Sequence, residues 1–478
     1  PEAGIFAAYT QRSKILHNTI HDPENALQRL IRVAHENDGL VVAGNLLSGP
    51  PMRLESEKGV DVGGNVTADM TALFAGVEEG NLHLTAAAAP APDARERSPD
   101  ALSDFDGEPR GERPGVGADE VLASVPLARG RIQARAGRPA RFPHRIWAAC
   151  DFESLTRDYG WFGSPEKKEI PAYPGNATAM GLAERQSGAA SAAMTGINPV
   201  PGPRMGKVNK LYLRYYIEGT DEAIFQHFSL STEDNNHILV TGLVQSRWTE
   251  LTLDFTRYGL RNDGTPGIPF KEGERMDDFK VFLGKPGDGR SYRLLLDDIV
   301  FFAEDPALPR EPEPFPNRVI YLAAFDTGEK ERYWPGDFEI VEKEAPAGAY
   351  WRVARSVLSP KGRGKFVRLQ IDPIRAVGEH TKLRFRYYLK GASRMTVQVF
   401  DLTDNDNRHV HLEGLKEEAW TTAYVDFTRD GKRNDGSATP FAAGHQVDDL
   451  FFFVDPGAAG GEVDLFLDEV TLFDAARG

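Results

Sequence analysis

The sequence predicts an all-β protein with three folded parts: the last coils of a right-handed parallel β-helix and two copies of one antiparallel β-sandwich. Three observations predict this fold. A stretch of roughly 160 residues occurs twice, apolar and polar residues alternate with period two in both copies, and asparagines recur every 20 to 27 residues or so near the start. No stretch keeps the period of an amphipathic helix, and 47 glycines and 32 prolines favour short strands joined by turns.

The duplication is clearest in one eleven-residue stretch. "DFTRYGLRNDG" begins at Asp254 and "DFTRDGKRNDG" at Asp426, with nine of the eleven positions identical. The similarity continues on both sides, in "KLYLRYYIEG" at Lys210 and "KLRFRYYLKG" at Lys382, and in "LLLDDIVFF" at Leu294 and "LFLDEVTLF" at Leu465. Because the offset stays at 171–173 residues, we expect two tandem sandwiches, at 145–304 (repeat 1) and 318–478 (repeat 2). "DFT" should end a strand, and "RNDG" should form the next turn.

The first 120 residues follow another pattern. Asparagine precedes strand-forming residues in "NTI" at Asn18, "NLL" at Asn45 and "NVT" at Asn65, with further short apolar strands between them. One asparagine at the same turn of each coil can stack on the next and bond to turn backbone, which is typical of a parallel β-helix. We therefore expect 1–120 to be the C-terminal coils of such a solenoid, with preceding coils removed or supplied by another chain.

Two resemblances support these assignments. The strand "GNLHL" at Gly80 and the stretch "DFDGEPRGERPGVGADE" at Asp104 resemble the closing segment of pectate-lyase-like and parallel-β-helix-repeat proteins. The first strand with "FE" or "FD", and the last strand L-x-L-D-[DE]-[IV]-x-x-F, resemble the jelly-roll sandwiches of carbohydrate-binding modules. The resemblances imply jelly-roll domains and sugar binding. Polysaccharide lyases and hydrolases with a β-helix have their active sites on the middle coils. The resemblance therefore implies that any active site would lie on coils that this sequence does not contain.

Two segments are predicted to be linkers. Residues 121–144 are rich in Arg and Pro, and we interpret them as a solvated linker or, alternatively, as a contact for an acidic partner or an anionic glycan. Residues 305–317 carry a proline at roughly every third position, which favours extended polyproline conformation. We therefore expect a semi-rigid spacer between two independent sandwiches.

The net charge, the single cysteine and the absence of common catalytic motifs limit the classes of function that the sequence allows. The formal net charge of -15 argues against a nucleic-acid partner, and no apolar run is long enough to span a membrane. The one cysteine, Cys150, excludes an intrachain disulfide and should be buried in a strand; a bacterial secreted or cell-surface protein that avoids cysteine fits this usage. No G-x-S-x-G, H-E-x-x-H or phosphate-binding glycine loop occurs, so we predict no catalytic residue in this chain.

Four carboxylates are candidate ligands of structural calcium. The jelly-roll resemblance implies that a carboxylate near the first strand and an aspartate near the last strand share one ion in each repeat. The pairs would be Glu153 with Asp297, and Asp326 with Asp468; the alternative is that they are exposed residues at strand ends. The stretch "TDNDNRH" at Thr403 lacks the glycine of a calcium loop, so a turn rich in Asx residues is the preferred interpretation.

Exposed aromatic rings are the candidate sugar platforms, because the apolar C–H face of a pyranose stacks on a ring. Trp161, Trp334, Tyr350 and Trp351 are the candidates, against the alternative that they pack internally. Trp248 and Trp420 match between the copies and are expected in the cores.

The sequence therefore predicts a non-catalytic glycan-binding region of a secreted or cell-surface bacterial β-helix protein, with a polysaccharide or cell-surface glycan as partner. Two alternatives stay open. The chain could be a structural subunit of an extracellular filament or surface assembly, self-associating with like subunits. It could also be part of a polysaccharide lyase or glycoside hydrolase whose active-site coils lie upstream.

Overall fold

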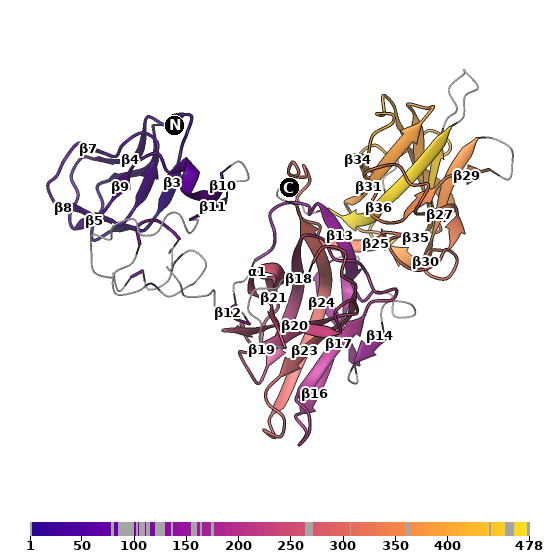
Figure 1. Ribbon diagram of the computed structural model, residues 1–478, viewed down its shortest axis with the longest axis horizontal. Coiled ribbons are helices and arrows are strands. Elements are labelled where there is room, and N and C mark those ends of the chain that lie inside the picture. Colours follow the sequence, from indigo (N-terminus) through magenta and orange to yellow (C-terminus); the bar gives the residue numbers. More distant parts are fainter. Residues whose placement is uncertain are drawn as a thin grey trace. The chain divides into compact units, whose positions relative to one another are not determined.

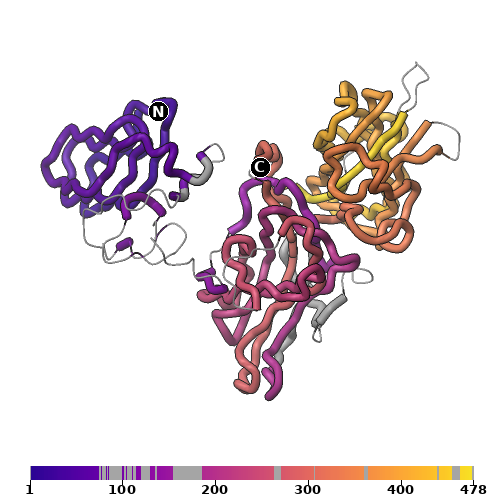
Figure 2. Tube along the Cα trace, viewed as in Figure 1, coloured from indigo at the N-terminus to yellow at the C-terminus, as the bar shows by residue number. Residues whose placement is uncertain are grey.

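The computed structural model divides the chain into two compact units, Pro1–Pro126 and Leu127–Gly478, and each is described by itself (Figures 1 and 2). The structure describes residues 2–77, 81–84, 100–101, 104, 110, 115–119, 130–134, 137–153, 160–162, 165–173, 176–262, 271–305, 307–359, 364–438, 441–454 and 463–475. Within them strands dominate, and the helical elements are the short α1 (Phe255–Tyr258) and the 3-10 turn Thr71–Leu73. The predicted all-β class is confirmed.

The first unit contains three parallel three-stranded sheets. They are formed by β1 (Ala3–Ala8), β4 (Arg29–Ala34) and β7 (Arg53–Leu54); by β2 (Lys14–Leu16), β5 (Leu40–Ala43) and β8 (Val60–Gly63); and by β3 (Thr19–His21), β6 (Leu46–Ser48) and β9 (Val66–Thr67). Three consecutive chain segments thus each give one strand to each sheet and stack as rungs. Their inward apolar side chains, such as Ile31, Val42 and Leu47, form a fully buried core.

The predicted asparagine stacking is confirmed. Asn45 Oδ1 accepts hydrogen bonds from the backbone N (2.9 Å) and Nδ2 (2.8 Å) of Asn18, and Asn65 Oδ1 accepts the equivalent bonds from Asn45 at 2.9 and 2.7 Å. Asn65 Nδ2 donates to the carbonyl oxygen of Val42 at 2.8 Å. The asparagine of one rung therefore hydrogen-bonds to the asparagine and the backbone of the neighbouring rung. These bonds pair polar groups of the turns that would otherwise stay unpaired.

Residues of the expected closing segment pack beside these rungs. The hairpin of β10 (Phe74–Gly76) and β11 (Asn81–Leu84) is tied to Asp119, whose Oδ2 accepts a bond from the backbone N of Leu84 at 2.6 Å. Buried Arg110 donates to the carbonyl oxygens of Gly117 (2.8 Å) and Ala118 (3.0 Å). Asp106, Gly107, Pro109 and Glu120 of the same segment lie outside the described residues.

Repeat 1 is a sandwich of two sheets (Figure 1). The predicted linker 121–144 contributes a strand, Arg131–Gln133, to the second of these sheets, so this part of it is not a linker. One sheet has the order β15-β16-β24-β18-β21 with β13 on β24; the strands are β13 (Arg145–Cys150), β15 (Pro165–Tyr173), β16 (Asn176–Gln186), β18 (Val208–Glu218), β21 (Thr249–Asp254) and β24 (Ser291–Glu304). The other has the order β12-β20-β19-β23-β17-β14 with β22 on β20; the strands are β12 (Arg131–Gln133), β14 (Gly160–Phe162), β17 (Ala193–Asn198), β19 (Ala223–Ser229), β20 (Asp234–Thr241), β22 (Leu260–Arg261) and β23 (Met276–Leu283).

In repeat 2 the first sheet has the same arrangement, whereas the second sheet lacks a counterpart of β12 among the described strands. One sheet runs β27-β28-β36-β31-β34 with β25 on β36; the strands are β25 (Arg318–Ala323), β27 (Glu339–Val341), β28 (Val353–Arg355), β31 (Thr381–Lys390), β34 (Thr421–Asp426) and β36 (Asp464–Asp474). The other runs β26-β30-β35-β32-β33 with β29 on β30; the strands are β26 (Gly336–Asp337), β29 (Val357–Leu358), β30 (Lys365–Ala376), β32 (Met395–Asp401), β33 (Asp406–Leu412) and β35 (Gln446–Val454).

The period-two patterns place the cores as predicted. In β31, Leu383, Phe385, Tyr387 and Leu389 all point into the buried core between the sheets of repeat 2. The bulge between β18 and β24 lies at Tyr212/Arg214, and the equivalent bulge between β31 and β36 lies at Arg384/Arg386, 172 positions later. Shared irregularities of this kind confirm the tandem duplication beyond the alternation of residues.

The described part of the repeated eleven-residue stretch is scaffold, as expected; Asp263 and Gly264 of the first copy lie outside the described residues. β21 ends at Asp254, whose Oδ1 accepts a hydrogen bond from the backbone N of Arg257 at 2.8 Å and caps α1. β34 ends at Asp426, whose Oδ1 accepts bonds from the backbone N of Thr428 (3.1 Å) and Arg429 (3.0 Å). An aspartate at each strand end therefore organises the following turn.

The prediction of two independent sandwiches is wrong. The ring of Phe142, just before repeat 1, packs on Phe473 (centroids 4.8 Å apart) of repeat 2. Phe315, the equivalent residue before repeat 2, packs on Tyr212 (4.9 Å) and Phe302 (5.5 Å) of repeat 1. Each presumed linker thus places its aromatic ring on the other repeat, and together they form a separate buried cluster. The two proline-rich segments also bond to each other, with Phe142 N donating to the carbonyl oxygen of Glu313 at 2.7 Å.

Candidate functional site

Buried ion pairs cross the interface between the repeats. Arg145, the first residue of β13, pairs with Asp326 and with Glu469 Oε1 (3.2 Å) of repeat 2. Its equivalent Arg318, the first residue of β25, pairs with Asp474 (2.9 Å) of its own repeat and Asp151 (3.7 Å) of repeat 1. The side chains of Arg145 and Arg318 are only 4% and 1% exposed. Such buried charges are tolerated because each arginine has two carboxylates beside it, and Arg318 also donates to the carbonyl oxygen of Ala376 at 2.7 Å.

Two more arginines complete this network. Arg384 pairs with Glu469 (3.2 Å) and Glu311 (2.7 Å) and donates to the carbonyl oxygen of His144 at 2.7 Å. Arg375 pairs with Asp151 and donates from Nε to the carbonyl oxygen of Ile320 at 2.9 Å. The proline-rich segments thus contribute Glu311 and His144 to a charge network that joins both repeats.

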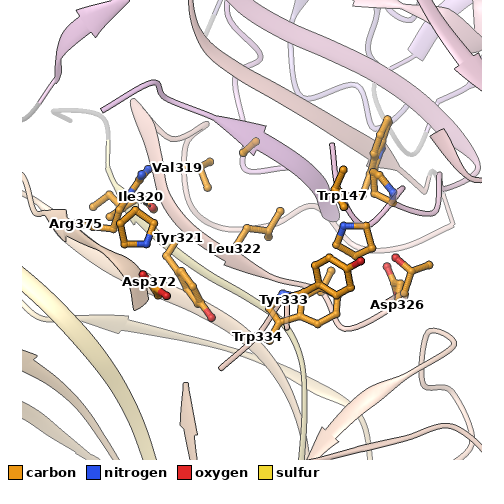
Figure 3. A pocket seen from close by; sticks show the side chains of 17 residues that line it. Trp147, Val319, Ile320, Tyr321, Leu322, Asp326, Tyr333, Trp334, Asp372 and Arg375 are labelled. Atoms are coloured by element: carbon orange, nitrogen blue, oxygen red, sulfur yellow. Dashed lines mark hydrogen bonds between the residues drawn. The ribbon is translucent and has the colours of Figure 1, made fainter. Parts of the chain in front are cut away.

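A cavity of about 170 Å³ lies at this interface, and we call it the inter-repeat cavity (Figure 3). Its lining combines Trp147, Val200 and Pro201 from repeat 1 with Tyr321, Asp326, Tyr333, Trp334, Asp372 and Arg375 from repeat 2. Figure 3 draws Tyr333, Trp334 and Asp326 on one side of the hollow and Tyr321, Asp372 and Arg375 on the other. Neither repeat alone encloses this space.

Some buried polar atoms of the cavity lining form no hydrogen bond within the described residues. Trp147 Nε1, Tyr321 Oη and Asp326 Oδ1 are buried and have no hydrogen-bond partner among the described residues. Trp147 is 3% and Asp326 5% exposed. Leaving a buried donor and acceptor unpaired costs about 1–3 kcal/mol each, so the cavity is suited to a molecule, or water, that offers both hydrogen-bond types.

The predicted platform Trp334 lines this cavity. Its side chain is 9% exposed and packs at 5.8 Å against Phe325 in the core of repeat 2, with Tyr333 6.1 Å away. Trp334 is therefore a wall of a cavity rather than an open platform. Trp161 lies on β14, and its side chain is outside the described part of the structure.

The other two predicted platforms hold arginines. The guanidinium of Arg145 lies 4.7 Å from the ring centre of Trp351 and 5.5 Å from that of Tyr350. Arg386 lies 4.3 Å from the Tyr350 ring, and Arg204 of repeat 1 lies 5.4 Å from the Trp351 ring. Both rings are half-buried and serve the interface through cation–π contacts.

Trp248 and Trp420 are not in the cores, which corrects the expectation from sequence. Both are half-buried, and they contact Tyr216 (6.1 Å) and Tyr388 (5.9 Å) respectively. Those tyrosines alternate with inward residues of β18 and β31, so the tryptophans lie on the outer side of the sheets. Cys150 is buried, as predicted.

The predicted calcium ligands have arginine partners. Asp297 pairs with Arg214 at 3.0 Å, and Asp468 pairs with Arg386 at 3.4 Å. Burial, with Asp298 as the next cause, raises the pKa of Asp297 well above its ordinary value; burial and then Glu469 and Asp326 do the same for the pKa of Asp468. Asp326 and Asp468 are thus near each other, as predicted. Asp151, which directly follows the first strand β13, also raises the pKa of Asp297, whereas the predicted ligand Glu153 is half-buried two residues later.

This arrangement fits arginine better than calcium. Ca²⁺ requires six to eight oxygen ligands, whereas Asp326, Asp468 and Glu469 already share the guanidinium groups of Arg145, Arg384 and Arg386. Sequence reasoning missed these arginines. A signal for Arg145 was present in the sequence, since "FPHR" at Phe142 and "FPNR" at Phe315 repeat a phenylalanine and an arginine at equivalent positions. A solvated spacer would not need to keep an aromatic and a charged residue at fixed positions.

The turn at Thr403 behaves as an Asx turn. Asp401 Oδ1 accepts bonds from the backbone N of Thr403 (3.0 Å) and Asp404 (3.2 Å). Asp401, Asp404 and His445 offer ligand atoms within 4.8 Å of one another, but Arg408 already pairs with both carboxylates, at 3.2 and 2.7 Å. The preferred interpretation of this stretch is confirmed.

No protein-family model matches the sequence, and no curated protein matches it. Among solved structures, the chain is similar to the tandem of two CBM22 domains from Xyn10C of Paenibacillus barcinonensis, with 12% identity, 72% of this chain and 100% of that chain covered, and a TM-score of 0.25. It is also similar to the tandem CBM51 modules of a family 98 glycoside hydrolase from Streptococcus pneumoniae (8%, 71% and 97% covered, TM-score 0.19). A third is SGBP-B from a xyloglucan utilization locus in Bacteroides uniformis (8%, 61% and 98% covered, TM-score 0.22). Within the described residues no helix has the length and apolarity needed to cross a membrane.

The calcium prediction is tested by chelation. Calcium that bridged the first and last strands would bind the folded state only, so EDTA would lower the melting temperature of the protein and added Ca²⁺ would restore it. Because arginines already pair with these carboxylates, we expect EDTA to leave the melting temperature unchanged. Differential scanning calorimetry measures both steps, with Mg²⁺ as the control ion. A fall in the melting temperature that Ca²⁺ reverses would contradict this expectation and support the calcium site predicted from the sequence.

The interface should also make stability depend on pH through Asp326. Burial raises the pKa of Asp326 to about 7, opposed by Arg145 and reinforced by Glu469. The folded state then holds more protons than the unfolded state between about pH 4 and 7, so this group makes the free energy of unfolding fall as pH rises, by at most about 1.4 kcal/mol per pH unit. Urea unfolding across this range should show a shallower fall in Asp326→Asn. The exposed Glu331→Gln is the control, and equal slopes in all three proteins would contradict the assignment.

Proposed function

We propose that Leu127–Gly478 is a non-catalytic glycan-binding region in which the inter-repeat cavity receives a sugar ring. The observation that carries this proposal is the lining of the cavity, which places an unpartnered donor, Trp147 Nε1, and an unpartnered acceptor, Asp326 Oδ1, among aromatic and apolar walls. A pyranose matches such a lining because its C–H faces are apolar while each hydroxyl both donates and accepts. Tyr333 and Trp334 supply the rings.

The proposal extends to the context of the region. The three stacked rungs with their asparagine ladder support the interpretation of the first unit as the last coils of a parallel β-helix. A glycan-binding pair of sandwiches after such a solenoid suits an accessory region of a secreted or cell-surface bacterial protein. The buried Cys150 and the lack of other cysteines agree with this location.

Binding should be lost when the lining changes. We expect the full chain to be retained in affinity gels that contain one of a panel of soluble xylan, glucan, galactan and polygalacturonate. Trp147→Phe removes the Nε1 donor, and Tyr333→Ala removes a ring; each should weaken binding at least about tenfold, which corresponds to roughly 1.4 kcal/mol.

Tyr9→Ala serves as the control, because Tyr9 is 72% exposed in the first unit and should not affect retention. Circular dichroism of each variant checks the fold. Retention of both lining variants at the wild-type level would overturn the proposed site, and no retention of the wild type by any member of the panel would overturn the proposed function.

A further inference from the structure

Two carboxylates, Asp326 and Asp372, line the inter-repeat cavity, and Figure 3 draws them on opposite sides of the hollow. Asp326 is 5% exposed, and its Oδ1 has no hydrogen-bond partner among the described residues. Asp372 is exposed. A ligand that lies between the two sides therefore has a carboxylate on each.

The positive charge in the lining is already balanced. The basic residue of the lining is Arg375, which pairs with Asp151 and donates from Nε to the carbonyl oxygen of Ile320 at 2.9 Å. Asp151 also lies 3.7 Å from Arg318, which has Asp474 as a second partner at 2.9 Å. Two arginines thus share two carboxylates, and an acidic ligand would have to compete with Asp151 for the buried Arg375.

The negative charge of Asp326 is only partly balanced. Arg145 pairs with Asp326 but also with Glu469 Oε1, 3.2 Å away. Burial raises the pKa of Asp326 to about 7, opposed by Arg145 and reinforced by Glu469. A raised pKa means that the surroundings disfavour the ionised carboxylate. A further acidic group in the cavity would therefore add to an excess of negative charge.

The unpartnered hydrogen-bonding atoms of the lining suit hydroxyl groups. Trp147 Nε1 is a neutral donor, and Tyr321 stays a neutral phenol because burial raises its pKa. A sugar hydroxyl accepts a bond from such donors and donates one to Asp326 Oδ1, whereas an ionised carboxylate only accepts. Two negative charges in a poorly solvated space also repel each other more strongly than they do in water.

We infer that the inter-repeat cavity selects neutral sugar rings and rejects uronic acids. The inference rests on the proposed glycan binding and adds the class of sugar that is bound. Asp326 and Asp372 are the selecting residues, because they accept hydrogen bonds from hydroxyl groups and repel a carboxylate on the ring. Arg145 and Arg375 serve the interface between the repeats instead of the ligand.

The selection is tested with sugars that differ at one position. The methyl glycosides of xylose, glucose and glucuronic acid share their ring hydroxyls and differ only in the group on C5, and those of galactose and galacturonic acid form a second series. Each is titrated into the full chain and followed by ligand-observed NMR at about pH 8, where Asp326 is ionised. The dissociation constants of the uronates should be at least about tenfold higher than those of their neutral counterparts.

The possible results separate this inference from the proposed function. Equal or tighter binding of the uronates would overturn the selection of neutral rings and leave glycan binding intact. No binding of any of these sugars, neutral or acidic, would remove both.

A variant of the exposed carboxylate provides the second measurement. Removing its charge in Asp372→Asn should narrow the preference for galactose over galacturonic acid at least about threefold. Asp221→Asn, at an exposed position outside the cavity lining, is the matched control and should leave this preference unchanged. Circular dichroism checks that both variants keep the fold. The same preference in wild type and Asp372→Asn would contradict the assignment of Asp372 as a selecting residue.

Discussion

Two equivalent arginines, each bound to a carboxylate of the other repeat, organise the unit Leu127–Gly478. Arg145 and Arg318 begin the first strands of their repeats, and each pairs with a carboxylate of the other repeat, Glu469 and Asp151 respectively. Removing one partner of a buried pair typically costs about 3–5 kcal/mol, because the remaining charge stays buried and unpaired. Two sandwiches that share such pairs cannot separate without exposing or stranding several charges. The duplication has therefore produced one body with an internal, approximately symmetric interface.

The site follows from that interface. A cavity between two sandwiches exists only if their relative placement is held, and here the arginine pairs and the reciprocal packing of Phe142 and Phe315 hold it. Asp326 links both features, because it lines the cavity and pairs with Arg145 through Oδ2, while its buried Oδ1 has no hydrogen-bond partner among the described residues. A ligand in the cavity would thus contact a carboxylate that also secures the interface, and binding and domain docking would stabilise each other.

Features that follow from a regular residue spacing could be predicted from the sequence. Features that depend on how the two repeats pack against each other could not. The strand alternation of β31 and the ladder of Asn18, Asn45 and Asn65 follow from spacings of two residues and of one coil, so the sequence carries them directly. Trp351 was predicted to be a sugar platform, yet its ring lies beside Arg204 of the other repeat. The pairing of Asp326 with Arg145 joins residues 181 positions apart, and no local pattern specifies which arginine a buried carboxylate will meet.

The central claim is that the two repeats form one rigid body. Double electron–electron resonance tests it directly, with spin labels on Asp221→Cys of repeat 1 and Glu413→Cys of repeat 2, both at exposed positions, while the buried Cys150 stays unlabelled. The account predicts one narrow distance distribution, which broadens in Arg145→Met because Asp326 and Glu469 then lose their shared partner. A broad distribution in the wild type, unchanged by that substitution, would contradict it.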